Sequence, residues 1–126
     1  MLAIQSLFII LLQLPVGRGC VDGEIESSAG VLYDVYCGED WSGNDLGYYD
    51  DVNNLSICLN DCDTWNSQSQ SPPCVGVSLG LYPPSVVGCY LKSLMEGLGY
   101  PQNNPNLYLV DSAKNVKLVS PQSRSE

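Results

Sequence analysis

The sequence of 126 residues contains no histidine and only five lysines and arginines, against 14 aspartates and glutamates. Without histidine, neither a Ser-His-Asp nor a Cys-His catalytic arrangement can be built. No glycine-rich phosphate loop, nucleophile elbow or dinucleotide fingerprint occurs either. The formal net charge of −9 repels phosphate backbones and anionic lipid headgroups. These absences favour a protein that is not an enzyme, needs no cofactor and does not bind nucleic acid.

Long apolar runs are also scarce, and the main one lies at the N-terminus. Residues 2–16 are apolar except for three polar positions. This run is shorter than the roughly 20 residues that a membrane span needs. Its place in the chain, and the small residues Gly17 and Gly19 after it, predict a secretory signal peptide over residues 1–19. We therefore expect a secreted, extracellular protein with no membrane insertion.

The remaining chain has the length of one domain with a modest core. We expect a single domain over residues 20–119, a disordered polar tail over residues 120–126, and a monomer. The six cysteines are an even number in a chain expected to be exported, which predicts a disulfide framework.

Local patterns predict one helix and about five strands. Leucines and cysteines recur at spacings of three and four between residues 54 and 65, which places them on one face of a helix. Two β-rich runs on either side of Pro83 and Pro84 are typical of a hairpin. The expected strands are residues 31–37, 74–82, 86–94 and 107–112, and the turn-rich stretch 38–51 is expected to hold a short strand near residues 46–49. The residues 116–119 are a possible further fragment. The fold class is therefore α+β, with one helix packed on a twisted antiparallel sheet.

One hairpin strand has a face of small residues. Gly76, Ser78 and Gly80 alternate with valines and leucines along residues 74–82. Glycine in a strand often marks a place where another element approaches closely. We expect the helix to approach the sheet over this small face.

Four cysteines connect the expected helix to the expected hairpin. Cys58 and Cys62 lie one helical turn apart, at about 6 Å. Cys74 and Cys89 lie on adjacent strands, which run about 4.8 Å apart. Two disulfides between helix and hairpin are therefore within reach, and geometry leaves both nested and crossed pairings open.

The other two cysteines, Cys20 and Cys37, pair by elimination and tie the start of the expected mature chain to the first strand. A zinc site is disfavoured, because there is neither a histidine nor a close C-x-x-C pair. The same lack of C-x-x-C spacing disfavours a redox role. All six cysteines are therefore interpreted as structural.

The segments SICLNDC, PPCVGVS and GCYLKS, preceded by YDVYCGEDWSGND, together resemble a PAN/apple domain of the compact type found in fungal secreted proteins. The resemblance covers residues 31–109. It implies the nested pairing Cys58–Cys89 and Cys62–Cys74. It also implies a binding module for proteins or carbohydrates without catalytic activity. Apple domains proper join their N- and C-terminal strands by a further disulfide, which is absent here because no cysteine follows Cys89.

The aromatic residues are eight tyrosines and two tryptophans against one phenylalanine. Such rings combine a rigid apolar face with a polar edge, which suits recognition of sugars and proteins. Four of them fall in predicted loops or turns beside Asp, Asn and Ser, and are the ligand-binding candidates: Trp41, Tyr48, Tyr49 and Tyr82. Ordinary half-buried packing is the alternative for these rings.

Two further motifs bear on modification and metal binding. Asn54-Leu55-Ser56 is an N-glycosylation sequon, which predicts a glycan on Asn54. The acidic residues around Asp40 and Asp45 lack the spacing of a helix-loop-helix calcium loop, so a solvated acidic face is expected and no metal site.

The sequence therefore predicts a secreted, disulfide-rich binding module that recognises an extracellular glycan or protein. One alternative is a small secreted effector that acts on a host protein. A weaker alternative is a small carbohydrate-active enzyme that uses two of its carboxylates.

Overall fold

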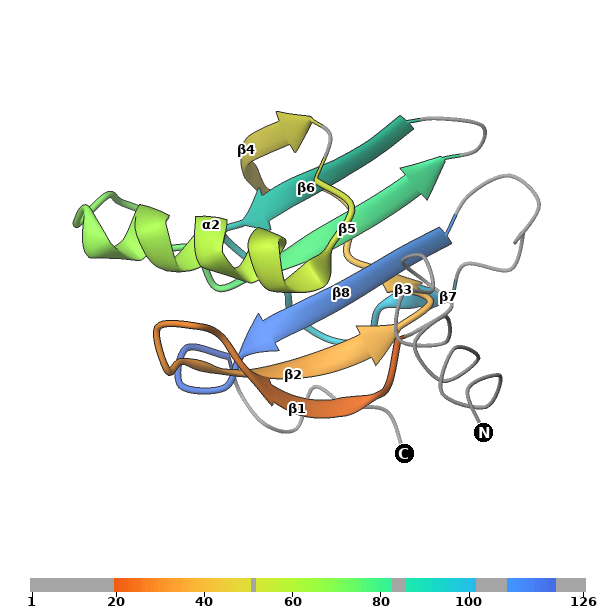
Figure 1. Cartoon of the computed structure of the whole chain (residues 1–126), viewed down its shortest axis with the longest axis horizontal. Coiled ribbons are helices and arrows are strands. Elements are labelled where there is room, and N and C mark those ends of the chain that lie inside the picture. Colours follow the sequence, from red (N-terminus) through yellow and green to blue (C-terminus); the bar gives the residue numbers. More distant parts are fainter. Residues whose placement is uncertain (1–19, 51, 83–85, 102–108, 120–126) are drawn as a thin grey trace, which may run out of the picture.

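The computed structural model describes residues 20–50, 52–82, 86–101 and 109–119 (Figure 1). The expected signal peptide over residues 1–19 and the expected tail over residues 120–126 lie outside the described residues.

The elements are β1 (Gly23–Glu26), β2 (Leu32–Cys37), β3 (Glu39–Asp40), β4 (Asp45–Asp50), α2 (Leu55–Ser67), β5 (Gly76–Tyr82), β6 (Val86–Lys92), β7 (Tyr100–Pro101) and β8 (Leu109–Asn115). A six-stranded antiparallel sheet forms the body of the fold, with strand order β1-β2-β8-β5-β6-β4. A small ribbon of two short strands, β3 and β7, accompanies it. The predicted α+β class with one helix on an antiparallel sheet is confirmed.

The main sheet contains β1 in addition to the predicted strands. This strand pairs with β2 after a turn in which the Ser27 amide donates to Val31 O and the Gly30 amide donates to Ser27 O. The last strand, β8, reaches Asn115, further than predicted, and lies between β2 and β5. Residues 116–118 form a turn and not the extra strand fragment.

Helix α2 begins at an asparagine cap. The Oδ1 atom of Asn54 accepts hydrogen bonds from the amides of Ser56 at 2.8 Å and Ile57 at 3.4 Å. This satisfies two of the amide groups that a helix start leaves without an internal partner. Asn54 is therefore the N-cap of the helix.

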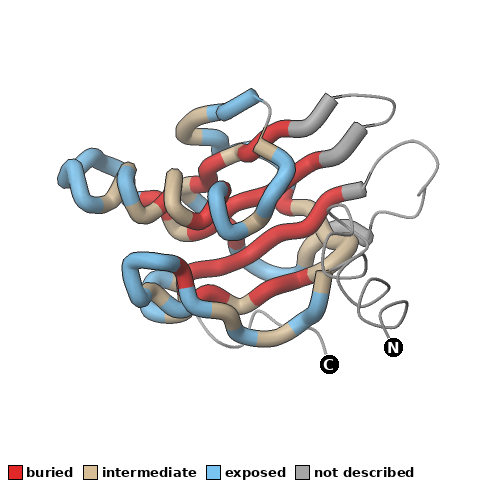
Figure 2. Tube along the Cα trace, viewed as in Figure 1, coloured by how far each residue is buried: buried red, intermediate tan, exposed pale blue. Residues whose placement is uncertain are grey.

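One face of the sheet, which we call the helix face, packs against α2 and forms the main core (Figure 2). The helix buries Cys58, Leu59 and Cys62 there. On the strands, residues opposite each other in the register share this face. They include Val77, Leu79, Cys89, Leu91 and Ala113.

The residues Gly76, Ser78 and Gly80 lie on the opposite face, which we call the small-residue face. The prediction that the helix approaches over them is wrong, because the larger Val77 and Leu79 of the same strand give the helix more apolar area to bury. A Cβ atom on Gly76 would lie 2.4 Å from the sulfur of Met95 and 2.3 Å from the carbonyl oxygen of Ala113.

Strand β3 also lies against the small-residue face. The Ser112 hydroxyl donates to Glu39 O at 2.7 Å, and the Ser78 and Ser112 hydroxyls are 2.8 Å apart. The small residues therefore give room to β3 and to the Met95 side chain.

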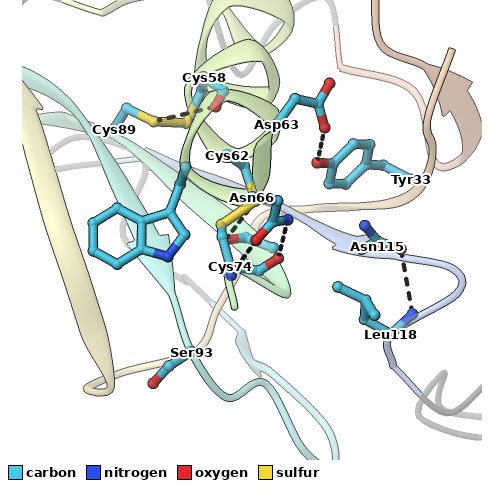
Figure 3. Close-up of a disulfide and its surroundings, with 12 residues drawn as sticks. Tyr33, Cys58, Cys62, Asp63, Asn66, Cys74, Cys89, Ser93, Asn115 and Leu118 are labelled. Carbon is cyan, nitrogen blue, oxygen red and sulfur yellow. Dashed lines mark hydrogen bonds between the residues drawn. A yellow bond between two sulfur atoms is a disulfide. The ribbon is translucent and has the colours of Figure 1, made fainter. Parts of the chain in front are cut away.

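Three disulfides fasten this arrangement, and Figure 3 shows the two that hold the helix, Cys58–Cys89 and Cys62–Cys74. Their Cα atoms lie 5.5 to 5.9 Å apart, and no cysteine is free. The helix is joined to the sheet region by the nested pairs that the family resemblance implies, and the first cysteine is joined to β2 as expected by elimination. The pairs are Cys20–Cys37, Cys58–Cys89 and Cys62–Cys74.

Within the described ranges, no helix has both the length and the apolar character that crossing a membrane requires.

Candidate binding site on the small-residue face

The small-residue face carries an open hollow of about 130 Å³. Its residues come from β5, β6 and β8 and from the stretch that runs from the last residue of β3 to the first residue of β4. The lining residues are Asp40, Ser42, Gly43, Asp45, Ser78, Gly80, Tyr90, Lys92 and Val110.

Strand alternation explains why a hollow forms at this place. Successive side chains of a strand point to opposite faces, so Val77 and Leu79 enter the core while Ser78 and Gly80 face the hollow. A serine and a glycine project little from the sheet, and a recess remains where larger side chains would fill the space.

An aromatic pair flanks the hollow on the side of β4. Tyr48 lies opposite Tyr90 in the register, with ring centroids 4.6 Å apart and planes inclined by 39°. The Tyr48 ring extends over Gly88, where a Cβ atom would come within 2.1 Å of it. Tyr48 is 44% exposed. The pair therefore offers aromatic surface next to the recess.

The acidic rim of the hollow is held by a buried lysine. The Nζ atom of Lys92 donates to the carbonyl oxygen of Gly43 at 3.0 Å and to the carboxylate of Asp45 at 2.5 Å. Lys92 is 4% exposed on its side chain and Asp45 is 45% exposed, so the cation lies beneath the rim and the anion at its surface. The Ser93 amide also donates to Asn44 O at 2.9 Å, which fixes the same loop.

The groups around the hollow can bind a polar ligand through two kinds of contact. The carboxylates of Asp40 and Asp45 and the hydroxyl of Ser42 provide acceptors, and the hydroxyl also provides a donor. The rings of Tyr48 and Tyr90 provide an apolar face beside them. Carbohydrates present this combination of hydroxyl groups and C–H surface.

Two of the predicted ligand-binding residues are separated by the sheet. Tyr49 lies opposite Cys89 in the register, so it shares the helix face, whereas Tyr48 shares the face of Tyr90. Tyr49 is 41% exposed, close to the value for Tyr48. Tyr82 ends β5, and its side chain lies outside the described residues.

Trp41 is buried, with 6% of its surface exposed. Its ring packs edge-on against Tyr36 at 5.2 Å, the Nζ atom of Lys114 lies 4.3 Å from the ring, and its Nε1 atom donates to Glu96 O at 3.3 Å. Trp41 lies outside the strands as predicted, but its ring has almost no exposed surface for ligand stacking, so the alternative of packing applies to it. Its neighbours Glu39 and Asp40 form β3, which pairs with β7. The indole follows β3 directly and packs with Tyr36 and Met95 on the small-residue face.

Sequence reasoning missed Ser78, Tyr90 and Lys92 as site residues. The alternation of small and large residues around Ser78 was visible, but it was assigned to contact with the helix. Tyr90 was expected only to pack within a strand, and Lys92 carried no distinguishing motif.

Among the residues that the structure describes, one group has the geometry of a metal site, formed by Cys20, Cys37 and Asp111 within 4.8 Å of one another. The two cysteines are joined in a disulfide, so they offer no thiolate. The Asp111 carboxylate accepts a hydrogen bond from the Gly38 amide at 3.0 Å. The disulfide ties Cys20 to the last residue of β2, and Asp111 of β8 binds the next amide along the chain. The two cysteines are therefore not available as metal ligands.

Comparisons with protein-family models, curated proteins and solved structures found no match to this chain.

Proposed function

We propose that the protein is a secreted binding module that recognises an extracellular carbohydrate through the hollow on the small-residue face. The observation that carries the proposal is the joint presence of the recess over Ser78 and Gly80, the acidic rim and the Tyr48–Tyr90 pair. The three disulfides are compatible with an extracellular protein. The PAN/apple resemblance of the cysteine segments also favours a binding module.

The size of the hollow sets what it can bind. Pockets that enclose a drug-sized ligand commonly have about 300–1,000 Å³, and this hollow has about 130 Å³. It is therefore suited to one sugar unit, bound at the surface of a longer glycan. Such an open site lacks the enclosed cleft that glycoside hydrolysis usually requires, which supports binding without catalysis.

The adjacent residues Tyr48 and Tyr49 allow a matched test. Both rings are exposed to a similar extent, but they belong to opposite faces of β4. Tyr48→Ala should reduce glycan affinity by about fivefold or more, because aromatic anchors of binding sites contribute over about 1 kcal/mol. Tyr49→Ala should leave glycan affinity unchanged. The measurement is retention of the oxidised protein on a glycan array, followed by titration calorimetry with the retained glycan.

A substitution at the rim provides a second pair. Ser42 is exposed and lines the hollow, so Ser42→Trp places an indole over the recess. Thr64 is exposed on α2, which covers the opposite face of the sheet, so Thr64→Trp adds the same ring away from the hollow and serves as the control. Glycan binding that survives Ser42→Trp would contradict the proposed site.

The alternative function is protein recognition by an effector, and one observation favours a place for it. Ile57 in the first turn of α2 is 49% exposed, and Tyr49 is exposed on the same face of the sheet. If no glycan is retained, and a host protein is captured by the wild type but not by Tyr49→Ala, the alternative replaces the proposal.

A further inference from the structure

The charges around the hollow are unevenly exposed, and this bears on which carbohydrate it binds. Of its charged residues, Lys92 is 4% exposed on its side chain and is engaged by Gly43 O and by the Asp45 carboxylate. Asp45 keeps 45% of its side chain exposed, and Asp40 is half-buried at the rim. A ligand entering the hollow therefore meets carboxylates before it meets a cation.

The surroundings of the hollow strengthen this bias. The chain carries a formal net charge of −9, which raises the local concentration of cations and lowers that of anions. Glycans rich in uronic acids or sulfate would bring further negative charge to Asp40 and Asp45. Such glycans would find no exposed cation among the described lining residues.

The aromatic pair adds a second preference for cations. The Tyr90 ring already has Nζ of Lys92 5.7 Å from its centroid. The exposed ring of Tyr48 therefore provides the negative quadrupole face that attracts a positive group of a ligand. A protonated amino sugar can place its C–H surface against Tyr48 and its ammonium group against a carboxylate of the rim. Such a pair is a charge-assisted hydrogen bond, which is stronger than a neutral one.

On the basis of the proposed function, we infer that the hollow prefers glycans with free amino groups, such as glucosamine polymers, over acetylated and anionic glycans. The preference comes from the partly exposed carboxylates of Asp40 and Asp45 beside the Tyr48–Tyr90 pair. It deepens the carbohydrate function by naming the class of sugar.

The test compares three oligosaccharides of equal length by titration calorimetry: a glucosamine hexamer, an N-acetylglucosamine hexamer and a galacturonic acid hexamer. The glucosamine hexamer should bind about fivefold more tightly than the acetylated one, the upper range for a partly exposed ion pair. Its affinity should fall as salt is added, because exposed ion pairs are screened. The galacturonic acid hexamer should bind most weakly.

Asp40→Asn tests the rim, and Glu24→Gln is its charge-matched control. Glu24 is exposed on β1, at the opposite edge of the main sheet from β4. Asp40→Asn should weaken glucosamine binding about threefold to fivefold while leaving the acetylated hexamer nearly unaffected. Glu24→Gln should change neither, although it removes the same net charge.

Two results would overturn the inference. Equal affinity for the free-amine and acetylated hexamers would refute the preference for amino sugars and leave carbohydrate binding intact. Equal weakening by Asp40→Asn and Glu24→Gln would assign the preference to net charge and not to the hollow. If no glycan of any class binds, the proposed function itself fails.

Discussion

The side chain of Asn66 joins the end of the helix to the segment that leads into β5, and its removal gives a sharp test of the fold. Its Nδ2 atom donates to Cys74 O at 2.9 Å, and its Oδ1 atom accepts from the Cys74 amide at 2.8 Å (Figure 3). Cys74 is fully buried and is also bonded to Cys62 of the same helix. One amide side chain thus satisfies both backbone groups of a buried residue.

Asn66→Ala should lower the free energy of unfolding by about 2–3 kcal/mol. Two hydrogen bonds at about 0.5–1.5 kcal/mol each set the lower part of this range. The unsatisfied backbone groups of Cys74 add to the cost, because a buried polar group without a partner loses its solvation. The Cys62–Cys74 disulfide closes the intervening loop in the folded and unfolded states alike, so loop-closure entropy does not enter the difference.

Urea unfolding of the oxidised protein measures this loss, with an unchanged m-value as the sign that the unfolded state is unaffected. Ser67→Ala is the control, since the Ser67 hydroxyl donates only to Thr64 O within the helix and is exposed. The control should lose less than about 0.5 kcal/mol. If Asn66→Ala is equally mild, then water replaces the amide at Cys74 and the reasoning from buried polar groups is wrong.

Three further predictions concern alkaline stability, the helix cap and the glycosylation sequon. Burial, followed by the hydrogen bond to Asp63, raises the pKa of Tyr33, so the folded protein holds this proton more tightly than the unfolded chain. Stability should therefore fall as pH rises above about 10, by at most about 1.4 kcal/mol per pH unit from this group. Tyr33→Phe should reduce that slope in urea unfolding, the exposed control Tyr49→Phe should not, and equal slopes for both variants would refute the assignment. At the cap, Asn54→Ala should cost about 1 kcal/mol and Asn54→Asp much less, because Asp keeps the acceptor oxygen. If the sequon is glycosylated, Asn54→Asp and Ser56→Ala should both remove the same glycan mass in intact-mass spectra, whereas unchanged spectra would show that Asn54 is unmodified.

The helix and the positions of its two cysteines were predictable because their signals are local, whereas the nested pairing with Cys74 and Cys89 was implied only by the PAN/apple resemblance. The spacing of Cys58 and Cys62 places both sulfurs on one helix face whatever the helix contacts. Two β-rich runs around Pro83 and Pro84 similarly define a hairpin from within a short segment. The part of the main core formed by the helix and the hairpin therefore follows from local signals, whereas Tyr33, Val35 and Ala113 join it from distant strands.

Strands β1 and β3 were missed because their formation depends on distant partners. The sequence GEIE of β1 has little intrinsic preference for a strand, and it is one because β2 pairs with it across a turn. The two residues of β3 are fixed by β7 and by the Ser112 hydroxyl, both far along the chain. The burial of Trp41 follows from the same contacts, so a loop interpretation was the natural reading of its local sequence.

The separation of Tyr48 from Tyr49 shows where sequence reasoning about the site stopped. Consecutive residues of a strand must face opposite sides of a sheet, so only one of the two rings can lie on the small-residue face. Which ring stays depends on the register with β6, where Tyr48 meets Tyr90 and Tyr49 meets Cys89. Only the disulfide from Cys89 to Cys58 of the helix then tells which side is covered.

The helix disulfides also help to explain how the small-residue face is tolerated. Glycine inside a strand costs roughly 0.5–1 kcal/mol relative to alanine, so Gly76, Gly80 and Gly88 together cost about 1.5–3 kcal/mol. Each of the two disulfides that hold α2 contributes about 2–4 kcal/mol. They act entirely on the helix face. Stability supplied on the helix face therefore offsets the conformational cost of the strand glycines, where Met95 packs on Gly76 and Tyr48 packs on Gly88.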